Sequence, residues 1–156
     1  MPTIQKAASE FLAHKRIAVT GVSRKAGDHG SNAVFKRLRE RGYEVFAVNP
    51  NADEVEGARS YHDLRSIPGG VEAVVIATAP DKAEGTMREC AELVIKHVWM
   101  HRLYGQGSVS ADAAAYGREH GITVIDGGCP LMFGPAADFG HKVVRVFFGS
   151  HIPKTV

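Results

Sequence analysis

Short apolar runs alternate with amphipathic segments along most of this chain. Apolar residues at helical spacing predict helices at residues 4–14, 31–41, 80–96 and 110–120. Between them, apolar runs rich in β-branched residues predict strands at residues 17–20, 44–48, 72–77, 98–100 and 122–125. The polar stretch at residues 51–70 predicts only a single helical turn near residues 63–66.

This alternation predicts an α/β fold of the Rossmann-like, doubly wound kind. Short connections require right-handed crossovers, and therefore a parallel sheet with helices on both faces. We expect about five parallel strands in the order 3-2-1-4-5, numbered along the chain. The ligand crevice of such a sheet lies at the carboxyl ends of the strands, at the switch point between strands 1 and 4.

The whole chain, residues 1–156, is predicted to form one domain, with a C-terminal extension from about residue 131. The apolar run at residues 143–148 leaves two alternatives open. It forms a short helix that packs back on the sheet, or a surface that a second subunit covers in a homodimer.

Composition and charge narrow the function classes. A hydrophobic content of 44% and a charged content of 23% are ordinary for a globular domain. A net charge of +2 is too small to indicate binding to nucleic acid or to a membrane surface. The chain has no long apolar run, so we expect neither a signal peptide nor a membrane span. Cys90 and Cys129 form no disulfide or metal motif, which indicates reduced thiols and a cytoplasmic location.

The loop after the first strand has the chemistry of an anion cradle. It reads Gly21-Val22-Ser23-Arg24-Lys25, and a helix follows near residue 31. The glycine lets the backbone approach an anion, and the helix N-terminus offers unpaired N–H groups. The spacing matches neither a P-loop nor a clean G-x-G-x-x-G fingerprint. A plain turn between strand and helix is the alternative.

The residues at the end of the second strand argue against NAD as the ligand. NAD-binding folds usually place Asp or Glu there to bind the ribose hydroxyl, whereas this strand ends in Asn49-Pro50. A carboxylate would repel a phosphorylated ribose, and a neutral amide would not. Asp53 and Glu54 follow closely, so this argument favours CoA over NAD without deciding it.

Two further loops fall at the same edge of the predicted sheet. Ala79-Pro80 follows the third strand, where small residues leave room for a flat ring, or where proline simply begins a helix. Cys129-Pro130 follows two glycines after the fifth strand. Cys129 would then lie near the crevice, or be a buried structural cysteine.

Together these segments resemble a known family. The chain is similar to the small stand-alone CoA-binding proteins, whose domain resembles the N-terminal domain of the succinyl-CoA synthetase alpha subunit. The segments that carry the resemblance are Gly21-Val22-Ser23, Val48-Asn49-Pro50, Ala79-Pro80, Val98-Trp99-Met100 and Gly128-Cys129-Pro130-Leu131-Met132.

The resemblance implies a bound CoA or acyl-CoA. It places the diphosphate or the 3′-phosphate on the loop from Gly21 to Arg24, the adenosine beside Asn49 and Pro50, and the adenine wall at Ala79 and Pro80. Cys129 and Pro130 match the Asn-Cys-Pro segment of the synthetase domain, with Gly128 in place of Asn. The synthetase's phosphorylated histidine lies in a second domain, so the resemblance implies binding without ligase activity.

Three other functions remain open. They are an NAD(P)-linked oxidoreductase or sensor, a small thioester enzyme that uses Cys129 as nucleophile with His101 as base, and a subunit of a split synthetase. The eight histidines form no metal motif. His101 and Arg102 follow the fourth strand, where they could face a ligand.

Overall fold

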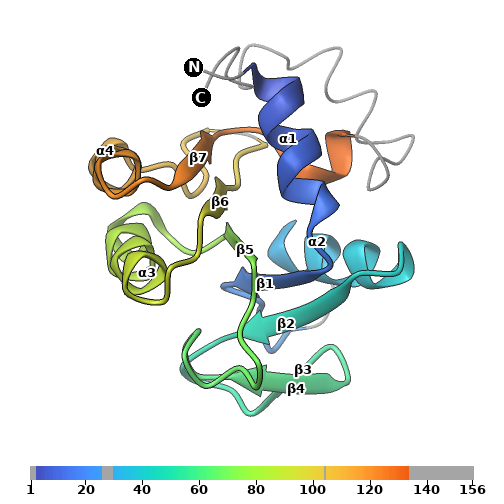
Figure 1. Cartoon of the computed structure of the whole chain (residues 1–156). Helices are drawn as coiled ribbons and strands as arrows, with labels where there is room; N and C mark the ends of the chain where they lie inside the picture. Colours follow the sequence, from blue (N-terminus) through green and yellow to red (C-terminus); the bar gives the residue numbers. More distant parts are fainter. Residues whose placement is uncertain (1–2, 26–29, 104, 134–156) are drawn as a thin grey trace.

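The computed structural model describes residues 3–25, 30–103 and 105–133 (Figure 1). The described elements are, in chain order, α1 (Ile4–Ala13), β1 (Arg16–Thr20), α2 (Gly30–Glu40), β2 (Glu44–Val48), β3 (Glu54–Val55), β4 (Ala58–Tyr61), β5 (Ala73–Ile76), α3 (Pro80–Glu92), β6 (His97–Met100), α4 (Ala111–Glu119), β7 (Thr123–Asp126) and the 3-10 helix Pro130–Met132. The expected packing of residues 143–148 lies outside the described residues.

The strands form one twisted sheet in the order β3-β4-β2-β1-β5-β6-β7. All neighbouring strands run parallel except β3, which pairs antiparallel with β4. The α/β doubly wound fold predicted from the sequence is therefore confirmed. The carboxyl ends of β1, β2 and β5 meet at one edge, where the chain order of the strands reverses between β1 and β5 (Figure 1).

The predicted strand order 3-2-1-4-5 is wrong. The predicted third strand, which is β5, pairs with β1 and not with β2. The outer edge of β2 is taken by β4, a short strand that carries Arg59 and Ser60 and lacks an apolar run. The predicted helical turn at residues 63–66 is instead a non-helical turn, in which Asp63 Oδ1 accepts a hydrogen bond from the Ser66 amide at 2.8 Å.

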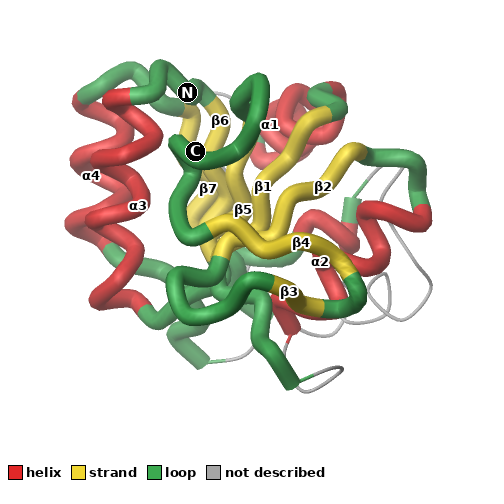
Figure 2. Tube along the Cα trace, turned by 90° about the horizontal axis from the view of Figure 1, so that it is seen from below, coloured by secondary structure: helices red, strands yellow, loops and turns green. Residues whose placement is uncertain are grey.

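Helices cover both faces of the sheet (Figure 2). Ile17, Val19 and Trp99 pack with α1 and α2 on one face. Ala18 and Val98 pack with α3 and α4 on the other. Alternate residues of β1 and β6 thus serve opposite cores, which is why these strands read as continuous apolar runs in the sequence.

Side-chain caps define where two helices begin. The Thr3 hydroxyl accepts a hydrogen bond from the Lys6 amide at 3.2 Å at the start of α1. The Ser110 hydroxyl accepts one from the Ala113 amide at 3.2 Å at the start of α4, as the sequence predicts. Each cap satisfies a backbone donor that the first turn of a helix leaves unpaired.

Helix α3 ends at Glu92, four residues before the predicted end. The amide of Ile95 donates to the Cys90 carbonyl at 2.9 Å, and the amide of Val94 donates to the Ala91 carbonyl at 3.2 Å. This pair of bonds is a Schellman motif, in which the residue at the Val94 position adopts a left-handed conformation. Val94 has φ 58° and its residue surface is 67% exposed. A β-branched residue is strained at this position, where glycine is the usual choice.

We therefore expect Val94→Gly to stabilise the protein. Relief of left-handed strain, roughly 1–2 kcal/mol, exceeds the entropy cost of a new glycine, roughly 0.5–1 kcal/mol. The midpoint of thermal unfolding should rise by about 2 °C, because about 1 kcal/mol shifts a domain of this size by roughly 2–4 °C. Leu93→Gly is the matched control, since Leu93 is also exposed but has φ −87°. It should lower the midpoint, and a fall with Val94→Gly would contradict the strain argument.

Candidate functional site

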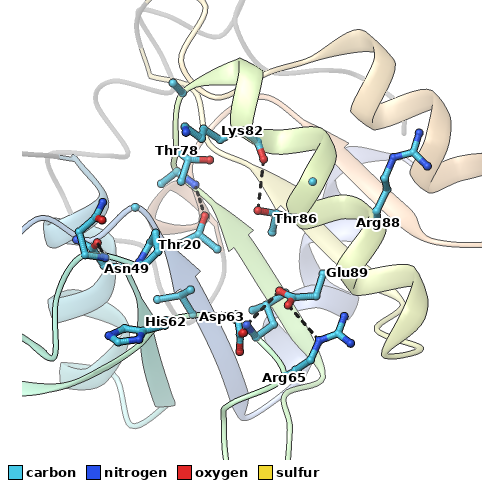
Figure 3. A pocket seen from close by; sticks show the side chains of 18 of the residues that line it. Thr20, Asn49, His62, Asp63, Arg65, Thr78, Lys82, Thr86, Arg88 and Glu89 are labelled. Carbon is cyan, nitrogen blue, oxygen red and sulfur yellow. Dashed lines mark hydrogen bonds and ion pairs between the residues drawn. The ribbon is translucent and has the colours of Figure 1, made fainter.

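A cavity of about 730 Å³ opens at the carboxyl ends of the parallel strands, beside α3 (Figure 3). It is large enough for a nucleotide-sized ligand. The residues that line it are Thr20, Gly21, Val48, Asn49, Pro50, Asn51, His62, Asp63, Leu64, Arg65, Ala77, Thr78, Ala79, Lys82, Gly85, Thr86, Arg88, Glu89 and Glu92. Four of the residues predicted to bind a cofactor are thereby brought together: Gly21, Asn49, Pro50 and Ala79.

Gly21 is required where β1, β2 and β5 converge. Its amide donates to the Val48 carbonyl at 3.0 Å, and its φ is +75°. A Cβ atom at this position would lie 2.6 Å from the carbonyl oxygen of Ala77. Only glycine allows this approach, so the floor of the cavity is built from closely packed backbone.

The loop that follows Gly21 is held by a buried amide side chain that the sequence analysis did not single out. Asn32, in the first turn of α2, is fully buried. Its Oδ1 accepts a hydrogen bond from the Ser23 amide at 2.8 Å, and its Nδ2 donates to the Ser23 carbonyl at 3.0 Å. The same Nδ2 group donates to Glu56 Oε1 at 2.8 Å. A polar amide directly after the loop was the available signal in the sequence.

The other predicted loop residues differ in exposure. Val22 is fully buried in the core, and its carbonyl accepts a hydrogen bond from Asn49 Nδ2 at 3.0 Å. Arg24 and Lys25 are exposed, and neither lines the cavity. The loop therefore presents two cations to solvent close to the strand ends.

Asn49 links two loops at the cavity edge. Its Nδ2 donates to Val22, and its Oδ1 accepts a hydrogen bond from the Asn51 amide at 2.8 Å. Its own amide donates to the Tyr61 carbonyl at 2.9 Å, which ties the end of β2 to the end of β4. A carboxylate here would keep the acceptor but lose the donor, which gives a local structural reason for the amide.

Two threonines line the floor with different hydrogen bonding. Thr20 Oγ1 accepts from the Ala77 amide at 3.2 Å and joins β1 to β5. Thr78 Oγ1 is buried and has no hydrogen-bond partner within the described part of the chain. A buried hydroxyl without a partner costs free energy, and a ligand group could satisfy it.

Charged side chains close the cavity between α3 and the loop after β4. Arg65 pairs with Glu92 at 2.5 Å. It also pairs with Glu89 at 3.5 Å (Figure 3). Glu89 also accepts a hydrogen bond from the Leu64 amide at 3.0 Å. The Glu92 carboxylate, through hydrogen bonding and charge, raises the pKa of Arg65. This network fixes the loop against the helix and offsets part of the negative charge at this end of the cavity.

The remaining basic side chains of the cavity point in different directions. Arg88 turns away, with its guanidinium 4.3 Å from the centre of the Tyr116 ring on α4 (Figure 3). Lys82 lies near the start of α3 and His62 lies at the end of β4. The hydrogen bond from the Ser66 hydroxyl lowers the pKa of Asp63.

Three other predicted residues are not among those that line this cavity. Pro80 is the first residue of α3 and is half-buried. Cys129 and Pro130 are buried, and Cys129 packs in the core beneath α1 and α2. The structure therefore does not bring the cysteine to the cavity wall.

His101 and Arg102 also lie outside the cavity lining. His101 follows β6, is buried, and packs against the first residue of α2. A Cβ atom at Gly30 would lie 3.3 Å from its Cε1. The Arg102 amide donates to the Gly128 carbonyl at 2.8 Å. Among the described residues, no group of three His, Cys, Asp or Glu side chains has the geometry to hold a metal ion. Nor does that part of the chain contain a helix with the length and hydrophobicity needed to cross a bilayer.

Comparisons with known proteins agree with this architecture. The model of the CoA binding domain matches residues 15–135. The chain is 33% identical over 111 residues to the uncharacterised protein YneT of Bacillus subtilis, covering 71% of this chain and 78% of that protein. It is 35% identical over 89 residues to the alpha subunit of an ADP-forming acetate–CoA ligase II of Pyrococcus furiosus. That match covers 56% of this chain and only 19% of the ligase subunit.

Solved structures show the same fold. The PH1109 protein redesigned for binding has a TM-score of 0.71 and 30% identity, over 80% of this chain and 84% of that one. A hypothetical protein from Pyrococcus horikoshii OT3 has a TM-score of 0.71 and 27% identity, over 79% and 83% of the two chains. The resemblance inferred from the strand-end segments is thereby confirmed, and the chain belongs to the CoA-binding domain family, with homology to the CoA-binding domain of ADP-forming acetate–CoA ligases.

Proposed function

We propose that this protein binds CoA or an acyl-CoA, with the nucleotide in the cavity at the strand ends. The observation that carries the proposal is the place of the cavity. It lies where the strand order reverses, which is where doubly wound sheets bind nucleotides, and it does so in a CoA-binding domain.

Different residues of the cavity would contact different parts of the nucleotide. Asn49 and Pro50 flank the adenosine, and Ala79 lies beside the adenine ring. Thr78 also lines this wall, and its hydroxyl, buried and without a partner in the described residues, would bond a polar edge of the ligand after a small rotation of the side chain. Lys82 adds a positive charge at the same rim.

The loop from Gly21 to Lys25 would hold the diphosphate. Its Ser23 backbone is held by Asn32, so the loop is shaped before the ligand arrives. Arg24 and Lys25 supply the positive charge. Cys129 and Pro130 are buried and do not line the cavity, so we assign them no contact with the nucleotide. We further infer a cytoplasmic protein that acts as a monomer or homodimer, without nucleic acid or membrane partners.

Binding without catalysis is the function that we favour. The ligase activity of the longer relatives is not carried over, because the match to the Archaeoglobus fulgidus ligase covers 12% of that enzyme. An NAD(P)-binding role is the second candidate, since the sheet places a Rossmann-like crevice at the same edge. The amide of Asn49 at the end of β2 argues for CoA.

A thermal-shift panel tests this function directly. CoA and acetyl-CoA should raise the unfolding midpoint, and NAD, NADP and ATP should do so much less. A ligand at one hundred times its dissociation constant stabilises the folded state by about 2.7 kcal/mol. A clear shift with NAD and none with CoA would contradict CoA binding and support the NAD(P)-binding function.

Asn49→Asp should weaken both the fold and CoA binding. The change places a carboxylate against the Val22 carbonyl and removes a donor, at a cost of about 1–3 kcal/mol. It also adds a negative charge beside the nucleotide. Asn51→Asp is the matched control, since it adds the same charge on the cavity lining and leaves the Asn49 bond to Val22 intact.

Calorimetric titration and thermal unfolding separate the two effects. Asn51→Asp should weaken CoA binding several-fold with little change in the unfolding midpoint, because a surface charge pair contributes about 1 kcal/mol. Asn49→Asp should lower both quantities. Unchanged CoA affinity in Asn49→Asp would show that this residue does not face the ligand.

The thioester-enzyme alternative predicts a reactive thiol, and the structure predicts the opposite. Cys129 and Cys90 are both fully buried, and burial raises the pKa of the Cys90 thiol. Only a thiolate is nucleophilic, so both thiols should react slowly in the native protein. We expect no labelling by a water-soluble disulfide reagent at pH 8 and labelling of both thiols in denaturant. Rapid native labelling of Cys129, located by peptide mass mapping, would support the enzyme.

A further inference from the structure

The turn of the β3–β4 hairpin contains a residue that such turns rarely use. Val55 pairs with Ala58, so the turn consists of Glu56 and Gly57. Their φ angles are 49° and 71°, and two left-handed residues in a row are the mark of a type I′ turn. Asn, Asp or Gly usually occupies the first position of this turn, because a longer side chain is strained there. The fold therefore holds Glu56 in this conformation at a cost in free energy.

The side chain of Glu56 carries a second cost, because its carboxylate lies inside the protein. The side chain is only 8% exposed. Removing a charge from water is unfavourable unless polar or charged partners replace the lost hydration. Two of its partners are on α2: Asn32 Nδ2 donates to Oε1 at 2.8 Å, and Lys36 Nζ lies 3.8 Å from Oε2. One buried carboxylate thus joins the hairpin tip to this helix.

The Asn32 side chain that contacts Glu56 also shapes the loop after β1. Its Oδ1 accepts a hydrogen bond from the Ser23 amide, and its Nδ2 donates to the carbonyls of Ser23 at 3.0 Å and of Lys25 at 3.3 Å. A side-chain amide has two N–H donors, so these two carbonyls and the carboxylate share them. The carboxylate is the strongest of the three acceptors, because charge strengthens a hydrogen bond. Glu56 therefore fixes the plane of the Asn32 amide, and through it the backbone of the loop.

We propose that Glu56 is a positioning residue for the loop from Gly21 to Lys25, and through that loop for the diphosphate of the ligand. Glu56 does not line the cavity, so it acts through Asn32. The inference rests on the proposed function, because it takes the loop to hold the diphosphate. It adds a role for the β3–β4 hairpin: the strained turn and its buried carboxylate hold the loop in its binding shape before the ligand arrives.

Binding of two ligands to Glu56→Gly tests this role. Glycine removes the carboxylate and also relieves the left-handed strain, so the hairpin can keep its turn. The affinity for CoA, measured by calorimetry, should fall about tenfold, as expected when a charged hydrogen bond that shapes the loop is lost. The affinity for 3′-AMP, measured by a nuclear magnetic resonance titration, should stay the same, because this nucleotide keeps the phosphorylated adenosine and lacks the diphosphate.

Two further variants separate the carboxylate from the hairpin as a whole. Glu56→Gln keeps an oxygen that can accept from Asn32 Nδ2, so its affinity for CoA should stay within about twofold of the wild-type value. Glu54→Gly is the matched control, because it removes the same side chain from an exposed position on β3 of the same hairpin. It should leave the affinities for both ligands unchanged.

Hydrogen exchange in the ligand-free protein tests the contact by itself. The Ser23 amide, which donates to Asn32, should exchange faster in Glu56→Gly than in the wild-type protein. The Gly21 amide, which donates to the Val48 carbonyl, should exchange at the same rate in both proteins.

Two sets of results would overturn the positioning role and leave the proposed function standing. One is a loss of affinity by the same factor for both ligands, or an equal loss in Glu54→Gly, since either would show a general loosening of the fold. The other is unchanged CoA affinity in Glu56→Gly. Failure of the wild-type protein to bind either ligand would overturn the proposed function, and the exchange rate of Ser23 would still decide whether Glu56 shapes the loop.

Discussion

The close approach of β1 to β5 at Gly21 is the constraint on which the site depends. A side chain at this residue would collide with the carbonyl of Ala77, and the Gly21 amide is committed to Val48. These contacts bring three strand ends together without intervening side chains. The crevice forms there because the chain then leaves in opposite directions, towards α2 from β1 and towards α3 from β5.

Polar groups around this junction hold the loops in place before any ligand binds. Asn49 joins the loops after β1 and β2, and Asn32 holds the Ser23 backbone from the first turn of α2. Arg65 fastens the loop after β4 to α3 through two carboxylates. A preformed site of this kind loses less conformational entropy when it binds a ligand, which suits a domain whose role is recognition.

Part of this arrangement could be predicted from the sequence, and the physical reasons differ between residues. The buried strands β1 and β5 are apolar on both faces, so their continuous apolar runs predict them directly from the sequence. The turns at Gly21 and Asn49-Pro50 could be predicted because glycine and proline favour turns after strands. The strand order could not be predicted, because β4 is half-exposed and carries Arg59 and Ser60. Its pairing with β2 displaces β5 to the other side of β1. Lys82 and Glu89 were missed because only the docking of α3 turns that face towards the cavity.

The account is tested most directly by a nuclear magnetic resonance titration of the isotopically labelled protein with CoA. It predicts that the amide signals of Gly21, Asn49 and Thr78 shift in a saturable manner, together with those of the loop after β4. Signals at the amino ends of the strands, such as those of Arg16 and His97, should stay in place. Saturable shifts confined to that opposite edge, or no shifts at all, would contradict the placement of the nucleotide at the β1–β5 junction.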